Sequence, residues 1–298
     1  MLLKDYFAAN LSPNDFVQQT NIIGCCDYIY YSSFFVQGNF VHFGINGIEE
    51  CISEPPEESC IIMCRFKDGE IYRLLEQCSH RSHYNYIIVQ TLIGDDGFID
   101  QSYFNLIPEN VKYIFSKNIR YTHPKIRPIP IGRDWRNTAE HNIQSYFKDE
   151  NTVFKNLAYL NFSIETCPMV RGKVYSMFHD KDWVTCRMPN AFKDYKISHT
   201  QFVSEIHLHK FCFSPVGFAF DCYRTWDALF AKTIPIVDHN CHVDYYYELP
   251  ILFTNTWEEI NEFYLEKKFV EMLETNYNVE IMLVSYWKEL FNCLKEKL

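Results

Sequence analysis

Short apolar runs alternate with amphipathic stretches along most of the chain. Runs of this length, bounded by turn-forming residues, predict buried strands, and stretches with apolar residues three and four positions apart predict helices. Strands are predicted at residues 28–35, 60–66, 86–93, 111–116, 127–131, 156–162, 183–186, 210–213, 234–237 and 249–253. Helices are predicted at residues 70–78, 168–178, 202–209, 222–231, 257–263 and 281–298.

The strands alternate with helices in two successive series, and the polar residues 133–148 separate them. Such alternation predicts α/β domains with parallel sheets, here two Rossmann-like domains that face each other across a cleft. We expect a first domain over residues 1–145 and a second over residues 146–298. In open parallel sheets ligands bind outside the carboxyl ends of the strands, so functional residues are expected in the loops that follow them.

Composition narrows the class of protein. The chain has 298 residues, of which 47% are apolar and 22% charged, and this suffices for a sizeable core. A net charge of −10 argues against a nucleic-acid partner. No apolar run approaches the roughly 20 residues that span a bilayer, and the N-terminus lacks a signal-peptide pattern. The 12 cysteines include no CxxC pair, so we interpret them as reduced thiols of a cytoplasmic protein without a membrane span.

The densest group of candidate site residues lies between residues 211 and 229, where a strand runs into a loop that contains Gly217 and then into a helix. Asp221 is predicted to cap that helix, whose free N–H groups and positive dipole end suit a phosphate. Arg224 adds a fixed positive charge, and Asp227, on the same face, can accept hydrogen bonds from sugar hydroxyls. A plainer interpretation is that Asp221 only caps the helix and that Arg224 and Asp227 form a surface ion pair.

These residues resemble the donor-site signature of exostosin-like glycosyltransferases, which are glycosyltransferase family 47 and its relatives with the GT-B fold. The resemblance rests on Ser214-Pro215-x-Gly217, Asp221-x-x-Arg224-x-Trp226-Asp227-Ala228-Leu229 and Ile234-Pro235-Ile236-Val237. Family members usually carry Glu at the position of Asp227. Residues 160–163, with Thr166 and Arg171, resemble the first strand and loop of the family's donor domain. Residues 113–118 and 123–132 resemble the end of its acceptor domain. The chain looks like the compact, soluble members found in microbes and large viruses.

The resemblance implies transfer of a sugar from a nucleotide-diphosphate donor to a hydroxyl of a glycan acceptor, with inversion and without a bound metal or other cofactor. UDP-sugars are the expected donors. UDP-xylose, UDP-glucuronate and UDP-N-acetylglucosamine remain open, as do GDP-sugars. The donor is expected on the second domain, where Arg171 and Arg224 offset the charge of the diphosphate, and helix 281–298 is expected to pack back on the first domain. The expected donor-binding residues are Asn161, Thr166, Arg171, Ser214, Pro215, Gly217, Asp221, Arg224 and Asp227.

An inverting transferase also needs a base that takes the acceptor proton, and we expect it in the first domain. Asp95 and Asp96 come first because they follow a predicted buried strand. His42 is the second candidate and Asp68 the third. Each of these residues also suits a turn or a helix cap.

Other interpretations remain beside this one. The pairs His80/His83 and His239/His242 could ligate a metal, although neither has a second half, and Asp180-Lys181-Asp182 reads as a solvated turn. The chain could be a catalytically silent nucleotide- or glycan-binding module of the same fold. It could also be a phosphoryl transferase, although it contains neither a GxxxxGKS/T nor a GxGxxG phosphate loop.

Overall fold

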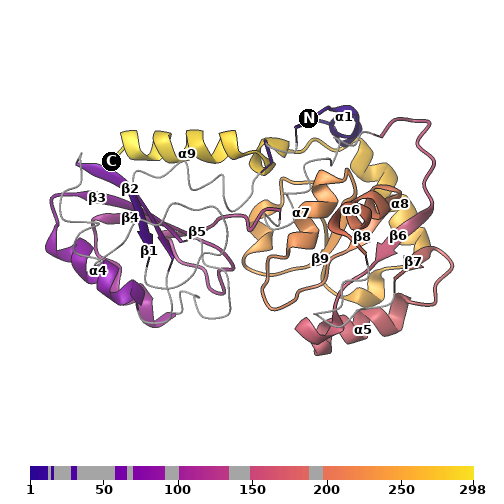
Figure 1. Cartoon of the computed structure of the whole chain (residues 1–298), viewed down its shortest axis with the longest axis horizontal. Helices are drawn as coiled ribbons and strands as arrows, with labels where there is room; N and C mark the ends of the chain where they lie inside the picture. The colour runs from indigo at the N-terminus through magenta and orange to yellow at the C-terminus, as the bar shows by residue number, and fades with distance from the viewer. Residues whose placement is uncertain are drawn as a thin grey trace. The chain divides into compact units, whose positions relative to one another are not determined.

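The computed structural model describes residues 1–12, 15–16, 28–31, 58–65, 70–90, 101–133, 148–187 and 197–298. The chain divides into two compact units (Figure 1). The first-sheet unit comprises residues 19–130 and 285–298, and the second-sheet unit comprises residues 1–18 and 131–284. Each unit is an α/β structure built on a parallel sheet, which is the predicted fold class.

The sheet of the first-sheet unit has five parallel strands in the order β1-β2-β3-β4-β5. Its strands are β1 (Tyr28–Tyr31), β2 (Ser59–Arg65), β3 (Asn85–Gln90), β4 (Val111–Ser116) and β5 (Ile126–Pro128). Helix α4 (Glu70–His80) and the 3-10 helix η2 (Gln101–Leu106) connect them. Residues 86–90 of β3 are all buried, as expected for a strand covered on both faces of a parallel sheet.

The C-terminal helix α9 (Val284–Glu296) packs on this sheet (Figure 1). The rings of Trp287 and Phe291, one helical turn apart and buried, lie 6.4 and 4.9 Å from the ring of Phe115 on β4. The side-chain amide of Asn85 donates a hydrogen bond to the carbonyl oxygen of Leu298 at 3.0 Å. The end of the chain therefore completes the core of the first-sheet unit.

The second-sheet unit contains a five-stranded parallel sheet in the order β10-β9-β8-β6-β7. Its strands are β6 (Asn156–Leu160), β7 (Val184–Cys186), β8 (His209–Phe213), β9 (Ile234–Asp238) and β10 (Leu252–Thr254). After β6 the chain places β7 on one side and then crosses over to place β8 on the other. The strand order therefore reverses between β6 and β8, and ligands of open parallel sheets bind at such a reversal.

Helices flank this second sheet. They are α1 (Leu3–Ala8), α5 (Pro168–Phe178), α6 (His199–His207), α7 (Tyr223–Phe230) and α8 (Glu262–Leu273), with 3-10 turns η4 (Ile164–Thr166), η5 (Val243–Tyr246), η6 (Trp257–Glu259) and η7 (Val279–Met282). Local chemistry explains their starts. Pro168 occupies the first turn of α5, Ser198 accepts a hydrogen bond from the Gln201 N–H before α6, and Asn261 accepts one from the Tyr264 N–H before α8.

The observed elements confirm the prediction of helix 168–178 and of strand 111–116 to the residue. The prediction of a helix ending at residue 263 is wrong, because α8 runs on to Leu273. Its buried residues Leu265, Phe269 and Met272 show the helical spacing, so the signal was present in the sequence. None of the helices that the structure describes is long and apolar enough to cross a membrane.

The N-terminal helix α1 belongs to the second-sheet unit and is held there by buried lysines. The Tyr6 hydroxyl donates to the Leu229 carbonyl at 2.6 Å, and the ammonium of Lys232 lies 3.6 Å from the Tyr6 ring and donates to the Tyr6 carbonyl at 2.9 Å. The backbone N–H of Lys148 donates to the Phe7 carbonyl at 2.9 Å, and its ammonium donates to the carbonyl of His209 at 2.8 Å. These contacts place residues 1–18 with residues 131–284, whereas the sequence interpretation put residues 1–145 together.

Candidate functional site

The loop of residues 214–222 leaves the carboxyl end of β8 and leads into α7, at the reversal of strand order. The Ser214 N–H donates to the Ile236 carbonyl, and the Ser214 hydroxyl lies 2.9 Å from that of Thr225. The Val216 N–H donates to Oδ2 of Asp238 at 3.0 Å. Both hydroxyls are buried. The loop is therefore fastened to the neighbouring strand β9 and to the first turn of α7.

Arg171, on α5, uses all of its hydrogen-bond donors to join this loop to the segment of residues 163–166. Nε donates to the Val216 carbonyl at 3.0 Å, and Nη2 donates to the Pro215 carbonyl at 3.2 Å and faces Sγ of Cys222 at 3.7 Å. Nη1 donates to the Ser163 carbonyl at 3.0 Å and to the Thr166 hydroxyl. An arginine side chain has five N–H groups, so each of them is engaged. Burial, followed by the charge of Arg224, lowers the pKa of Arg171 to about 10.

The position of Arg171 explains why residue 217 is a glycine. A Cβ atom at residue 217 would lie 2.5 Å from Nη2 and 3.0 Å from Cζ of Arg171, closer than atoms pack. Glycine is therefore required here because the loop backbone presses against a guanidinium.

Arg224 differs from Arg171 because its donors are unused within the described part of the chain. Its Nε is buried without a hydrogen-bond partner there, and the same holds for the hydroxyl of Ser163. The Cζ atoms of Arg171 and Arg224 both lie 5.6 Å from the centroid of the Phe162 ring, so two guanidinium groups flank one aromatic side chain. Buried polar groups in proteins are nearly always paired, and an unpaired cationic donor indicates a site for an anionic ligand.

Asp221 does not cap α7, which corrects the sequence interpretation. Cys222 is the N-cap residue and makes no side-chain capping bond. The buried carboxylate of Asp221 instead accepts from the Ile131 N–H at 2.8 Å and from Nε1 of Trp226 at 2.7 Å. Nε2 of His242 lies 3.4 Å from the same carboxylate. Asp221 therefore links the backbone at Ile131 to the Trp226 side chain of α7.

Asp227 forms no ion pair with Arg224 in the structure. Its carboxylate is buried, with Oδ1 3.1 Å from Nε2 of His199 and 3.8 Å from Nε of Arg133. The Arg133 guanidinium in turn lies 3.8 Å from the centroid of the Phe230 ring. The alternative of a solvated surface pair is therefore wrong. Sequence reasoning missed His199 and Arg133, because neither stands at a spacing that points to Asp227.

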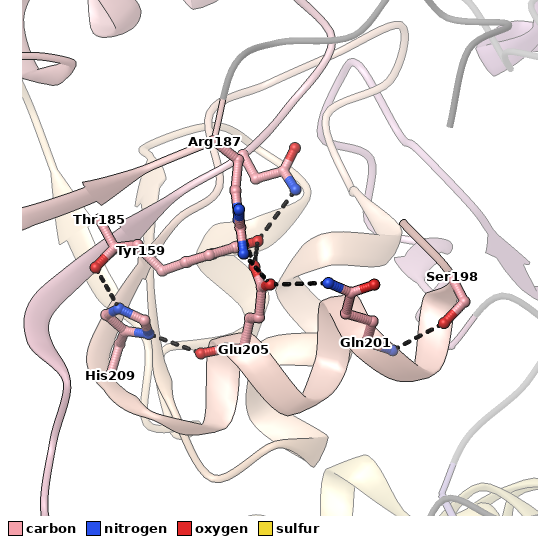
Figure 2. A network of polar contacts seen from close by, with 8 residues as sticks. Tyr159, Thr185, Arg187, Ser198, Gln201, Glu205 and His209 are labelled. Atoms are coloured by element: carbon pink, nitrogen blue, oxygen red, sulfur yellow. Dashed lines mark hydrogen bonds and ion pairs between the residues drawn. The ribbon is translucent and has the colours of Figure 1, made fainter. Parts of the chain in front are cut away.

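A second polar cluster ties the carboxyl ends of β6 and β7 to α6 (Figure 2). The Glu205 carboxylate accepts from the Tyr159 hydroxyl at 2.8 Å and from two nitrogens of Arg187, one of them Nε at 2.8 Å. His209 bridges the Glu205 carbonyl and the Thr185 hydroxyl, at 2.7 and 2.8 Å. This cluster positions the loops next to the β6–β8 reversal.

Two of the smaller predicted donor-binding residues have partners inside the protein. The Asn161 amide donates to the Tyr159 hydroxyl at 3.1 Å, and the Thr166 hydroxyl donates to the Ser163 carbonyl at 2.9 Å. Both lie in the segment that follows β6, close in sequence to Phe162. Their segment contains Phe162 and Ser163 of the candidate site. A direct contact of Asn161 or Thr166 with a ligand stays a prediction.

The candidate bases lie in segments that the structure does not describe. Asp95, Asp96, His42 and the third candidate base Asp68 lie outside the described residues. The segment Asp180-Lys181-Asp182 is an exposed turn, as predicted. Among the described residues no group of three or more His, Cys, Asp or Glu side chains is arranged to hold a metal ion.

Comparisons with known proteins give distant similarity. No family model matches the chain. A Plasmodium falciparum protein provisionally named histone-lysine N-methyltransferase 1 is 21% identical over 187 residues, and the match covers 61% of this chain but only 2% of that protein.

Among solved structures, an α1,3-fucosyltransferase is 14% identical over 82% of this chain and 80% of its own, with a TM-score of 0.46. A UDP-forming α,α-trehalose-phosphate synthase from Burkholderia vietnamiensis is 7% identical over 81% of this chain and 72% of its own, with a TM-score of 0.44. An α1,3-fucosyltransferase with GDP has a TM-score of 0.42 at 14% identity, over 84% of this chain and 94% of its own. These three structures share only a distant similarity of the backbone with this chain.

Proposed function

We propose that the chain is a glycosyltransferase that takes a sugar from a nucleotide-diphosphate donor, with the diphosphate bound at Arg224. The observation that supports this most directly is the Nε of Arg224, which is buried without a hydrogen-bond partner among the described residues, as is the hydroxyl of Ser163. Both belong to segments that follow the strands flanking the reversal of strand order, β6 and β8. A diphosphate supplies the negative charge and the acceptor oxygens that these two donors lack.

The helix α7 strengthens an anion site at this place. Arg224 lies in its first turn, where backbone N–H groups have no partner within the helix and the dipole is positive. Because Ser163, Thr166 and the loop engage all five donors of Arg171, we assign it loop positioning and a contribution of charge, and Arg224 the direct contact. The carboxylate of Asp227, on the same helix, contacts His199. We propose that it orients a sugar or ribose hydroxyl, either directly or through His199.

The donor is proposed to be a UDP-sugar, such as UDP-xylose, with GDP-sugars as the alternative, and the transfer to a glycan hydroxyl is proposed to proceed with inversion and without a metal. The names of the similar solved structures, a fucosyltransferase with GDP and a UDP-forming synthase, are compatible with either nucleotide. The base that takes the acceptor proton is proposed to be Asp95 or Asp96, with His42 next.

Exchange of Arg224 tests the site. Arg224→Ala should weaken binding of UDP or GDP by about 10- to 100-fold, because a charge-assisted hydrogen bond is worth roughly 1.5–3 kcal/mol and a tenfold change in Kd about 1.4 kcal/mol. Arg224→Lys keeps the charge without the planar fork and should lie between Arg224→Ala and the parent. Isothermal titration calorimetry gives the Kd of each.

The matched control is Lys181→Ala, which removes an exposed cation of the same unit. It should leave the Kd unchanged. Unchanged nucleotide affinity in Arg224→Ala would overturn the assignment of the diphosphate to Arg224.

A silent binding module of the same fold is the alternative function, and product release separates the two. The enzyme should release free UDP or GDP from at least one nucleotide sugar in the presence of acceptor glycans. Tight nucleotide binding without any release across a panel of donors would favour the module.

A further inference from the structure

The segment of residues 161–163 follows β6 and carries two parts of the candidate site. The Ser163 hydroxyl is buried without a hydrogen-bond partner among the described residues, and the buried ring of Phe162 lies 5.6 Å from Cζ of both Arg171 and Arg224. The segment forms neither helix nor strand, so contacts with its neighbours must fix its position. Arg171 holds its end, through the Ser163 carbonyl at 3.0 Å.

The start of the segment is held by a chain of hydrogen bonds that runs from Asn161 through Tyr159 to Glu205 (Figure 2). Nδ2 of Asn161 donates to the Tyr159 hydroxyl at 3.1 Å, and that hydroxyl donates to Oε2 of Glu205 at 2.8 Å. Glu205, on α6, is held in turn by Nε of Arg187 at 2.8 Å and by Nε2 of Gln201 at 3.2 Å. A carboxylate on α6 is thereby linked to the first residue of the segment.

The direction of each hydrogen bond in this chain is fixed. Burial raises the pKa of Tyr159, so its hydroxyl keeps the proton at neutral pH. Burial also raises the pKa of Glu205, but hydrogen bonds from Arg187 and Tyr159 outweigh this effect and hold that pKa below its usual value. An ionised carboxylate only accepts, so Tyr159 donates to it and its oxygen accepts from the Asn161 amide. The Asn161 side chain is therefore held in one orientation.

A second branch of the same cluster leads to β7. Nδ1 of His209 lies 2.7 Å from the Glu205 carbonyl, and Nε2 of His209 lies 2.8 Å from the Thr185 hydroxyl. Within the described residues the Thr185 hydroxyl makes no hydrogen bond to the segment 161–163. The two branches thus offer a matched pair of hydroxyls, Tyr159 and Thr185, of which only the first is joined to the candidate site.

We propose that Glu205 and Tyr159 are positioning residues of the diphosphate site. Through Asn161 they hold the Ser163 hydroxyl and the Phe162 ring where nucleotide binding needs them, and they touch no ligand themselves. The inference rests on the proposed function, because it concerns the same site. A donor whose position is fixed before binding gives more affinity than a mobile one, since ordering a mobile group costs binding free energy.

Calorimetric titration of the full chain with UDP and with GDP tests the assignment. Tyr159→Phe keeps the ring and removes the hydroxyl, and it should weaken binding of the tighter nucleotide by about 3- to 10-fold, the equivalent of one hydrogen bond. Thr185→Val removes the hydroxyl of the other branch and should leave the Kd unchanged. Melting temperatures are measured on both variants. Equal weakening of binding in the two variants would indicate a general loosening and would overturn the inference.

Glu205→Gln separates positioning from charge and carries the test if Tyr159→Phe does not fold. Removal of a negative charge would by itself tighten the binding of an anionic nucleotide. Glutamine, however, has one accepting atom where Glu205 has two, so the bonds from Arg187 and Tyr159 cannot all be kept. Positioning therefore predicts binding weaker by about 2- to 5-fold, the opposite sign.

A double-variant cycle with Ser163→Ala supplies the last arm. In that background Tyr159→Phe should lose most of its effect on the Kd, because the hydroxyl that it positions is gone. Strict additivity, parental affinity in Tyr159→Phe, or binding by Glu205→Gln as tight as the parent's would each overturn the positioning role and leave the nucleotide site in place. Absence of both UDP and GDP binding in the parent chain would instead count against the proposed function, and the inference would fall with it.

Discussion

Replacement of Gly217 by alanine probes the loop that carries the candidate site. The new Cβ would stand 2.5 Å from Nη2 of Arg171, and ordinary contact begins near 3.4 Å, so the guanidinium or the loop must move by roughly 0.9 Å. The φ angle of Gly217 is not in the left-handed region, so backbone strain adds nothing to this contact.

The loss of stability in Gly217→Ala is set by the contacts that Arg171 would lose. A shift of this size breaks the Nη2 hydrogen bond to the Pro215 carbonyl and the contact with Sγ of Cys222. Loss of a buried hydrogen bond from a charged donor costs about 1–3 kcal/mol, and the reduced entropy of the unfolded chain after Gly→Ala returns about 0.4–1 kcal/mol. We expect the free energy of unfolding to fall by about 1–2 kcal/mol, together with weaker nucleotide binding.

Gly172→Ala is the matched control. Among the described residues its Cβ would meet only Cγ2 of Ile164, at 3.8 Å, and alanine in the interior of α5 should stabilise the protein by about 0.5–1 kcal/mol. Urea denaturation of both variants measures the difference. In the double variant with Arg171→Ala, the effect of Gly217→Ala should disappear. A Gly217→Ala protein as stable as Gly172→Ala, or strict additivity in the double variant, would refute the reasoning.

Four further predictions concern two buried basic groups, the absence of a metal requirement and the candidate base. Burial lowers the pKa of Lys232 from 10.5 to about 7. Between these pH values the unfolded chain binds one proton more than the folded protein, so the free energy of unfolding should rise with pH. Lys232→Met should flatten that rise in urea titrations at several pH values, and equal slopes in the variant and the parent would contradict the prediction. Burial lowers the pKa of His209 to about 4 from 6.5, so stability should fall as the pH drops through this interval, and His209→Gln should reduce the fall. Sugar transfer should survive EDTA, and either Asp95→Asn or Asp96→Asn should reduce its rate while donor affinity is kept; loss of activity with chelator, or full rates in both variants, would remove these assignments.

Much of the second-sheet unit is predictable because its signals are local. The apolar run before Ser214 predicts β8, the proline at position 168 marks the start of α5, and the short run 234–237 predicts β9. The glycine at 217 could be recognised as important from its place between strand and helix. Its reason, the guanidinium of Arg171 against the backbone, comes from a residue 46 positions away in the sequence and has no local signal.

The roles of the charged residues were less predictable than the elements that carry them. Asp221 stands where a capping residue is expected, yet its carboxylate turns to Ile131 and Trp226, because buried donors from distant segments satisfy it better than the helix end does. Arg171 and Arg224 look equivalent as isolated cations. They differ only because the carbonyls of residues 163, 215 and 216 surround one of them.

By itself the sequence determined the α/β class and most strand and helix positions, since hydrophobic spacing and turn residues act over a few neighbours. It also determined the segment in which the candidate site lies. Tertiary structure decided that α1 joins the second-sheet unit, and that His199 and Arg133 meet Asp227. It also left Nε of Arg224 buried without a hydrogen-bond partner in the described part of the chain. These outcomes depend on which distant side chains are buried together, and burial is settled only when the sheets and helices pack.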